Sequence, residues 1–381
     1  MTVGKAAIAG VGESDELGVV PHKTALQLHA EASRNALAEA GLTKDDVDAL
    51  FTAGLTTSEL GEYLGIAPRY TDGTHVGGAS FVIHLGHAAA AIAAGLCSVA
   101  LISHGQSGRS RVGAPMLPLY GVNQQQFEAP FGLPTPTGAY AMACARHMHR
   151  YGTTHAQLAE IAVATRAWAA LNPKALMRDR ITIEDVLNSR WIAWPLHLLD
   201  CCLVTDAGGA IVVTSVERAR DMSAKPVTVL GHGEHHSHSM ISQMPDLTTG
   251  PGVVSGARAF EMAGVRPEAI DVTEVYDSFT FTVLMSLEDL GFCAKGEGGA
   301  FVSGQRTAPG GSFPLNTQGG GLSYTHPGMF GVFTIVEAVR QLRGDYARAG
   351  QSERQVRDAR LALVHGTGGV LSATGTAVLG V

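Results

Sequence analysis

The chain has 381 residues, which exceeds a usual single domain and suggests two packed domains or one duplicated α/β unit. Only 16% of its residues are charged, and its formal net charge at pH 7 is -7. Because no run of Lys or Arg occurs, this composition argues against a nucleic-acid or anionic-membrane surface and favours a small ligand.

Three features of the sequence together predict a cytoplasmic protein without a membrane span. Residues 1–18 indicate a first strand and a glycine loop, because they lack the apolar core and cleavage site of an export signal. Residues 85–103 form the most apolar stretch and change midway from alanine-rich to β-branched, which predicts a buried helix followed by a buried strand. The five cysteines are scattered without CxxC spacing, so reduced, mostly buried thiols are expected.

An internal duplication is the most informative pattern in the sequence. Residues 32–51 predict an amphipathic helix that stops at Gly41, then an acidic turn and an apolar strand. Residues 257–276 repeat this order, with a helix that stops at Gly264. The two glycines are separated by 223 residues, and so are the aspartates of the two turns. This constant offset indicates two copies of one folding unit.

A second helix and strand follow in each copy. The predicted pairs are helix 88–95 with strand 99–105, and helix 335–344 with strand 361–366. Fully apolar strands predict sheets that helices cover on both faces. We therefore expect an α/β protein with an N-terminal half at 1–220 and a C-terminal half at 221–381.

A long excursion at about 106–199 interrupts the first half. It contains Pro-rich and aromatic segments and a predicted helix at 153–171. Long insertions on rigid scaffolds usually carry binding surfaces or subunit contacts. The sequence leaves both of these roles open.

Several strings resemble motifs of the thiolase superfamily, and together they span nearly the whole chain. The matching strings are 205–210, 274–279, 316–321, 326–328 and 365–369. The strand-turn motif at 274–279 and the preceding segment 195–202 resemble the sterol-carrier-protein-x branch in particular. The resemblance implies the thiolase fold: duplicated βαβ halves in a layered α-β-α-β-α architecture, with residues 106–199 as a loop-domain insertion.

The chain departs from that family at the positions that carry its covalent chemistry. The position of the thiolase nucleophile falls on Gly78, so the thiolate that holds the acyl group between two half-reactions is missing. Tyr276 stands where thiolases carry Asn or His, and His365 stands where they carry a second cysteine. Only His326 keeps the identity that the resemblance implies.

A reaction without an acyl-enzyme fits these departures. The resemblance to thiolase-like steroid side-chain aldolases implies a CoA-thioester C–C lyase that performs retro-aldol cleavage of a β-hydroxyacyl-CoA. His326 would polarise the thioester oxygen, and Tyr276, Tyr324 or His365 would act as the base. A tyrosine, with a usual pKa of about 10, needs a cationic or hydrogen-bonded neighbour for that role. CoA enters as part of the substrate, and no tightly bound cofactor is expected.

Groups around the lost nucleophile are candidates for holding the enolate oxygen. The helix start at Ser80 offers N–H groups, and Gly368 and Gly369 belong to the C-terminal loop. Each side chain also has a structural alternative. Ser80 would cap its helix, Tyr276 would be a core aromatic, and His365 would hydrogen-bond its own loop.

A histidine-rich segment follows the predicted strand 227–230. Four histidines and Glu234 lie within residues 232–238, but their spacing fits no standard zinc pattern. We therefore expect a loop that contacts the ligand and no metal site.

Two other functions remain open at the level of the sequence. An acyltransferase of the thiolase type would carry the acyl group on another residue, such as Ser80. A non-catalytic subunit would scaffold a complex instead. The resemblance further implies a homodimer and a small OB-fold partner protein that bears a zinc ribbon.

Overall fold

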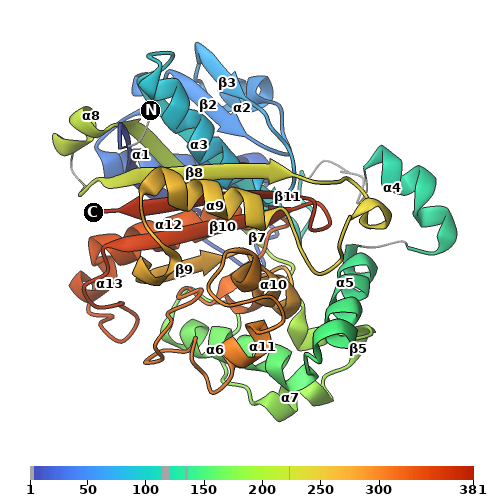
Figure 1. The fold of residues 1–381 in the computed structure, drawn as a ribbon. Coiled ribbons are helices and arrows are strands. Elements are labelled where there is room, and N and C mark those ends of the chain that lie inside the picture. The colour runs from blue at the N-terminus through green and yellow to red at the C-terminus, as the bar shows by residue number, and fades with distance from the viewer. Residues whose placement is uncertain (1–3, 114–120, 134–135, 223) are drawn as a thin grey trace.

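A nine-stranded sheet organises the computed structural model, which describes residues 4–113, 121–133, 136–222 and 224–381 (Figure 1). The strand order is β3-β2-β4-β7-β1-β8-β11-β10-β9. The strands are β1 (Ala6–Glu13), β2 (Ala49–Thr52), β3 (Tyr70–Asp72), β4 (Val99–Ser107), β7 (Asp206–Ser215), β8 (Val227–His236), β9 (Val272–Val275), β10 (Leu361–Gly368) and β11 (Ala373–Gly380). A separate small hairpin joins β5 (Trp191–Ala193) to β6 (Leu196–His197).

Helices lie on both faces of the large sheet and in the insertion. They are α1 (Ala25–Ala40), α2 (Thr57–Leu64), α3 (Ser80–Ala93), α4 (Val122–Phe127), α5 (Pro136–Tyr151), α6 (His155–Leu171), α7 (Ile183–Asn188), α8 (Val216–Arg220), α9 (Gly252–Ala263), α10 (Thr280–Asp289), α11 (Gly298–Val302), α12 (Gly331–Arg343) and α13 (Asp345–Arg348). A π-helical turn, η6 (Gly320–Tyr324), precedes α12.

The predicted duplication is visible in equivalent elements of the two halves. Helices α1 and α9 both end at a left-handed glycine, Gly41 with φ 73° and Gly264 with φ 68°, whose N–H groups bond back to the last turn. Each helix leads to a short buried strand, β2 or β9, which pairs in parallel with β4 or β10. The order β2-β4-β7-β1 in the first half thus matches β9-β10-β11-β8 in the second. The division at 220/221 falls between α8 and β8 and stays a prediction.

The helices form an α-β-α-β-α layering around the strands. Glycines let the outer helices approach closely: a Cβ on Gly10 of β1 would lie 2.1 Å from the Ala36 carbonyl oxygen of α1, and one on Gly231 of β8 would lie 2.1 Å from that of Ala259 in α9. Helices α3 and α12 contact strands of both halves and bury the core between them, including Phe81. The two sheets that this architecture implies are joined here into one ladder by pairing of β1 with β8.

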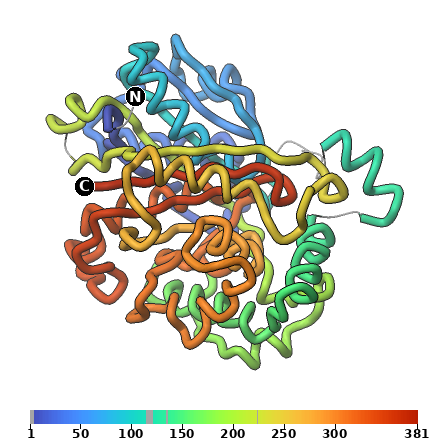
Figure 2. Tube along the Cα trace, viewed as in Figure 1, coloured from blue at the N-terminus to red at the C-terminus, as the bar shows by residue number. Residues whose placement is uncertain are grey.

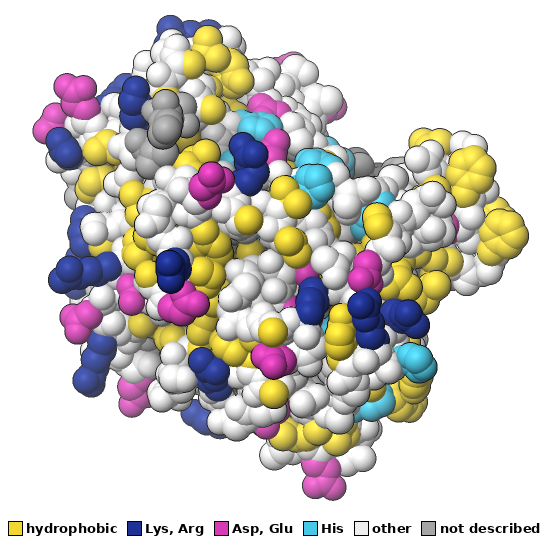
Figure 3. Space-filling model, viewed as in Figure 1, with side chains coloured by type: hydrophobic (Ala, Val, Ile, Leu, Met, Phe, Trp, Pro, Cys, Tyr) yellow, Lys and Arg dark blue, Asp and Glu magenta, His cyan; other side chains and the backbone are white. Residues whose placement is uncertain are grey.

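The insertion packs under the C-terminal half, as Figure 2 shows for the green and orange segments. Helix α6 contacts α10 and α11 there. Helix α4 instead projects from the body of the molecule, and hydrophobic side chains gather at its tip (Figure 3). Val122, Phe127 and Phe131 are 69%, 58% and 88% exposed. Exposed apolar groups of this kind are typical of surfaces that a partner covers.

Two sequence-based expectations need correction. The strand predicted at 227–230 continues as β8 to His236, so most of the histidine-rich segment is strand and not a loop at the ligand entrance. It continues because residues 232–236 pair with β11. The helix predicted at 88–95 is the second part of α3, which begins at Ser80. Among the described residues, no helix is long and apolar enough to cross a membrane.

Candidate active site

A pocket of about 530 Å³ lies where the loop before α3, the turn after β9, the segment after η6 and the end of β10 converge. These segments contribute Gly78, Tyr276, His326, and Gly368 with Gly369. The glycine segments pack directly on each other, since a Cβ on Gly368 would lie 1.7 Å from the carbonyl oxygen of Val76. The structure therefore brings together four parts of the chain that the sequence analysis singled out.

A tyrosine–histidine pair forms the centre of this pocket. The Tyr276 hydroxyl lies 2.6 Å from Nε2 of His326, and the two rings are stacked with centroids 5.5 Å apart. Backbone bonds position both residues. The Tyr276 N–H donates to the His365 carbonyl over 2.9 Å, and the His326 N–H donates to Oγ1 of Thr205 over 2.8 Å.

Burial keeps this pair uncharged at neutral pH. It lowers the pKa of His326 to about 4, although the carbonyls of His326 and Leu203 favour the protonated form. It also raises the pKa of Tyr276 well above its usual value. A neutral imidazole beside a phenol can accept the phenolic proton while the phenol oxygen accepts a proton from a ligand hydroxyl. The pair is thus able to relay a proton.

Gly78 is coupled sterically to Tyr276. A Cβ built on Gly78 would lie 1.9 Å from Cε1 of the Tyr276 ring. The tyrosine therefore occupies the space that the side chain of a nucleophile at position 78 would need. The two departures predicted from the sequence, at Gly78 and Tyr276, therefore meet in one packing contact.

The structure does not support any of the three roles suggested for Ser80. It is the first residue of α3 and is fully buried outside the pocket lining. Its hydroxyl accepts from the Val76 N–H over 2.9 Å and donates to the Gly77 carbonyl over 2.7 Å. These bonds fasten the glycine loop and leave Ser80 unsuited to carry an acyl group, to contact the substrate or to act as the helix N-cap, which is Ala79.

Tyr324 also lies outside the pocket lining. Its hydroxyl donates to the carboxylate of Glu13, which forms ion pairs with Lys174 and Arg340. Tyr324 is 2% exposed, and its hydroxyl is already engaged by Glu13. Its role as the base is not supported, because the π-helical turn directs its side chain toward β1.

His365 contributes its carbonyl to the site, but its side chain points elsewhere. Nδ1 lies 2.8 Å from Oγ1 of Thr376 on the neighbouring strand. The ring faces α9, where its Cε1 would meet a Cβ on Gly252 at 3.4 Å, whereas the next residue, Gly366, faces α3. Alternation along β10 thus turns the imidazole away from the pocket. Its catalytic role is not supported, and the structural alternative fits.

His365→Gln is expected to change acid stability and leave catalysis nearly intact. Burial lowers the pKa of His365 to about 4, so between pH 6.5 and 4 the unfolded chain binds the proton and the folded chain does not. Stability from this group is therefore lost as pH falls through that window, by at most about 2 kcal/mol at pH 5. Urea unfolding at pH 7 and pH 5 should show a smaller loss for the variant than for the wild type. A large fall in kcat at pH 7 with an intact fold would return His365 to the catalytic set.

Several pocket residues come from the insertion or its flanks and were missed at the sequence level. The Tyr140 hydroxyl donates to the Gly369 carbonyl over 3.1 Å, and its ring packs on Phe279. Cys202 and Arg111 also line the pocket. The predicted binding role of residues 106–199 was the one available signal. No motif marks Tyr140 or Arg111, because they reach the site only through the packing of α5 and the loop after β4, whereas Cys202 ends the family-like segment 195–202.

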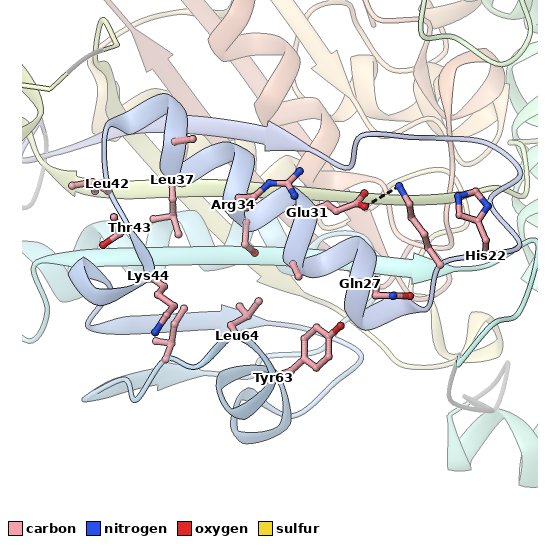
Figure 4. A pocket seen from close by; sticks show the side chains of 15 residues that line it. His22, Gln27, Glu31, Arg34, Leu37, Leu42, Thr43, Lys44, Tyr63 and Leu64 are labelled. Atoms are coloured by element: carbon pink, nitrogen blue, oxygen red, sulfur yellow. Dashed lines mark ion pairs between the residues drawn. The ribbon is translucent and has the colours of Figure 1, made fainter.

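A larger cavity of about 750 Å³ lies between α1 and α2 (Figure 4). Its cationic side chains are already neutralised: Lys23 pairs with Glu31, and Arg34 pairs with Asp15. It contains neither the tyrosine–histidine pair nor the glycine loops. We therefore assign the chemistry to the smaller pocket. In the described ranges, no group of three or more His, Cys, Asp or Glu is arranged to hold a metal ion.

Comparisons with known proteins place the chain in a family. Residues 233–381 match the family model described as Thiolase C-terminal domain-like. The chain is 40% identical to 17-hydroxy-3-oxo-4-pregnene-20-carboxyl-CoA lyase of Mycobacterium tuberculosis, over 90% of this chain and 93% of that protein. It is 39% identical to a steroid side-chain-cleaving aldolase of Thermomonospora curvata, over 90% and 91%. The solved structure of the Ltp2-ChsH2(DUF35) aldolase superposes with a TM-score of 0.89 at 34% identity, covering 100% of this chain and 98% of that one.

The layered fold, the glycine loops and the retained histidine define the class of protein. The chain belongs to the thiolase superfamily, in the sterol-carrier-protein-x-like branch. Within that branch it is similar to the steroid side-chain aldolases.

Proposed function

We propose that the chain is a CoA-thioester lyase that cleaves the Cα–Cβ bond of a β-hydroxyacyl-CoA without a covalent acyl-enzyme. The observation that carries this proposal is the Tyr276 ring in the space beside Gly78, hydrogen-bonded to a neutral His326. This arrangement removes the nucleophile and supplies a proton relay in its place. The relatives named as a lyase and an aldolase support the same reaction class.

The proposed reaction is a retro-aldol cleavage. The phenol oxygen of Tyr276 accepts the proton of the β-hydroxyl while its own proton passes to Nε2 of His326. The Cα–Cβ bond breaks, the β-carbon becomes a carbonyl, and the electron pair forms the thioester enolate. The same relay then returns the proton to Cα. This assigns His326 to the relay, where the sequence had suggested direct polarisation of the thioester oxygen.

Backbone amides are the proposed support for the enolate oxygen. The glycines at the start of α3 and in the loop after β10 line the pocket on the side of Gly78. A Cβ on Gly77 would lie 2.9 Å from the Gly369 nitrogen, so glycine permits this close approach of the two loops. Positioned N–H donors of this kind stabilise developing negative charge.

The proposed acyl group is bulky and apolar. Phe279, Leu203 and Val204 line the pocket together with the tyrosines. Both relatives above carry names that refer to steroids, so a steroid acyl-CoA is the first substrate to test. With 17-hydroxy-3-oxo-4-pregnene-20-carboxyl-CoA, the chain and any partner it needs should release a 17-ketone and a shortened acyl-CoA, measured by mass spectrometry. Absence of both products with every branched β-hydroxyacyl-CoA tested would remove the proposal.

Turnover is expected to be insensitive to iodoacetamide. Cys202 is the thiol that lines the pocket, and burial raises its pKa well above its usual value, so little reactive thiolate forms. Cys202→Ala should retain kcat within a few-fold of the wild type, because no step uses the thiol. Assays after treatment of both proteins with iodoacetamide check this. Inhibition of the wild type but not of Cys202→Ala would reflect blockage of the pocket, whereas a loss of turnover on mutation alone would favour covalent catalysis.

We also propose a small OB-fold partner with a zinc ribbon, a homodimeric state and a cytoplasmic location. The similarity to a solved aldolase that includes a DUF35 component supports the partner. Purification of the tagged protein from its native host with mass spectrometry of copurified proteins tests the partner, and light scattering of the purified protein tests the homodimer. The acyltransferase alternative has lost its suggested acyl carrier, because Ser80 is buried and its hydroxyl is hydrogen-bonded to its own loop.

A further inference from the structure

Arg111 carries the single formal charge among the described residues that line the pocket. The lining contains no Asp or Glu, and its histidine, His326, is neutral because its pKa is about 4. Arg111 is an exposed residue, so its side chain lies at the rim. The chain as a whole has a formal net charge of -7, so this local positive charge is opposite in sign to that of the molecule.

The Arg111 guanidinium is free of protein partners in the described part of the chain. No ion pair or hydrogen bond joins it to another described side chain or carbonyl. The neighbouring segment 114–120 contains no acidic residue in its sequence. An unpaired guanidinium beside a pocket retains its full capacity to bind an anion, with up to five N–H donors.

The loop that carries Arg111 is held by a buried carboxylate, Asp206. Its oxygens accept the N–H groups of Arg109 and Ser110 over 2.8 Å and 2.9 Å, and that of Val20 over 2.8 Å. The Ser110 hydroxyl donates to it as well. Burial alone would raise the pKa of Asp206, but these donors hold it below its usual value. Asp206 thus organises the loop by accepting hydrogen bonds from its backbone and from Ser110, and it does not pair with the Arg111 guanidinium.

Arg111 itself is in a strained backbone conformation. Its φ is 59°, in the left-handed region that non-glycine residues rarely adopt. Its N–H donates to the Ser107 carbonyl over 3.0 Å, and the Val112 N–H donates to Oγ of Ser107 over 3.0 Å. Strain of this kind persists where surrounding bonds over-determine it, and it is concentrated at ligand sites.

We propose that Arg111 binds a phosphate group of the CoA moiety at the rim of the pocket. The inference rests on the proposed function for the presence of a CoA thioester. The phosphates are the strongest anions that such a substrate brings, and the planar guanidinium matches a phosphate with two parallel hydrogen bonds. A cation at this point also offsets the repulsion between an acidic protein and an anionic substrate.

The test compares a CoA thioester with the corresponding pantetheine thioester, which has the same reacting atoms and no phosphate. Arg111→Gln should raise KM for the CoA thioester by about 10- to 100-fold with kcat nearly unchanged. The same variant should leave KM for the pantetheine thioester unchanged, and Arg111→Lys should recover part of the affinity. Arg109→Gln is the matched control: it is exposed, does not line the pocket and keeps its backbone bond to Asp206.

Calorimetric titration of free CoA provides a readout that does not depend on C–C cleavage. Weaker CoA binding by Arg111→Gln, with loss of part of its salt dependence, supports the site even where no lyase activity is found. An equal penalty for CoA and pantetheine thioesters would assign Arg111 to the acyl group and overturn the inference. Unchanged CoA binding by the variant, or no CoA binding by the wild type, would overturn it too. Cleavage of the pantetheine thioester would leave the proposed function standing in either case.

Discussion

Tyr276→Phe is expected to lower kcat for C–C cleavage by about 10²- to 10⁴-fold, because the variant loses the proton relay. The phenylalanine keeps the ring that packs on His326 and Phe330 and removes the hydroxyl that lies 2.6 Å from Nε2 of His326. The fold should therefore be preserved, with a change in unfolding free energy of about 1 kcal/mol. Steady-state kinetics with the β-hydroxyacyl-CoA and urea unfolding measure the two effects separately.

Tyr324→Phe is the matched control for the same loss of a buried tyrosine hydroxyl. Glu13 keeps its ion pairs with Lys174 and Arg340, so the expected cost is to stability, with kcat within a few-fold of the wild type. The reverse outcome, an inactive Tyr324→Phe and an active Tyr276→Phe, would mean that the wrong tyrosine has been assigned as the base.

His326→Ala should match Tyr276→Phe in kcat. Full activity of a complex that contains the His326→Ala variant would favour a scaffold role.

The architecture was predictable because local sequence signals encode it and because these signals occur twice in the chain. Helix-capping glycines and apolar strands recur at one offset, and the backbone geometry at Gly41 and Gly264 requires the same residue in both copies. The importance of Gly78, Tyr276 and His326 was also predictable from departures and matches at motif positions. Their contact was not, since it depends on how β9 and α3 approach each other across the core.

The side chains of His365 and Tyr324 point away from the pocket for identifiable physical reasons. On β10, Gly366 faces α3 and the preceding residue, His365, faces the other side of the sheet. In a strand, a shift of one residue moves a side chain to the opposite face. Tyr324 lies two residues from His326, but η6 winds the backbone so that its hydroxyl reaches Glu13. Proximity in sequence to a motif does not fix the direction of a side chain, and both predictions relied on that proximity. Arg111 was missed because only tertiary structure shows which cations lack a partner.

Gly78→Cys is expected to abolish lyase activity without creating a thiolase. The new Cβ would lie 1.9 Å from the Tyr276 ring, so the ring or the glycine loop must move. Overpacking of this kind costs about 1–3 kcal/mol of stability, and a displacement of about 1 Å at the reacting groups is enough for a 10²-fold loss in kcat. Gly78→Ala is the matched control, because it introduces the same Cβ without a thiol. Both variants should lose activity to a similar extent in steady-state assays.

The double variant Gly78→Cys with Tyr276→Asn separates packing from chemistry. Asn is smaller than Tyr and leaves space for the cysteine, so unfolding free energy should recover most of what Gly78→Cys loses. Lyase activity should not return, because the phenol is gone. The thiol would then stand near the start of α3 and His326, where iodoacetamide should label it faster than Cys202, as mass spectrometry can show. A fully active Gly78→Ala, or a double variant no more stable than Gly78→Cys, would show that residues 78 and 276 are not coupled through packing.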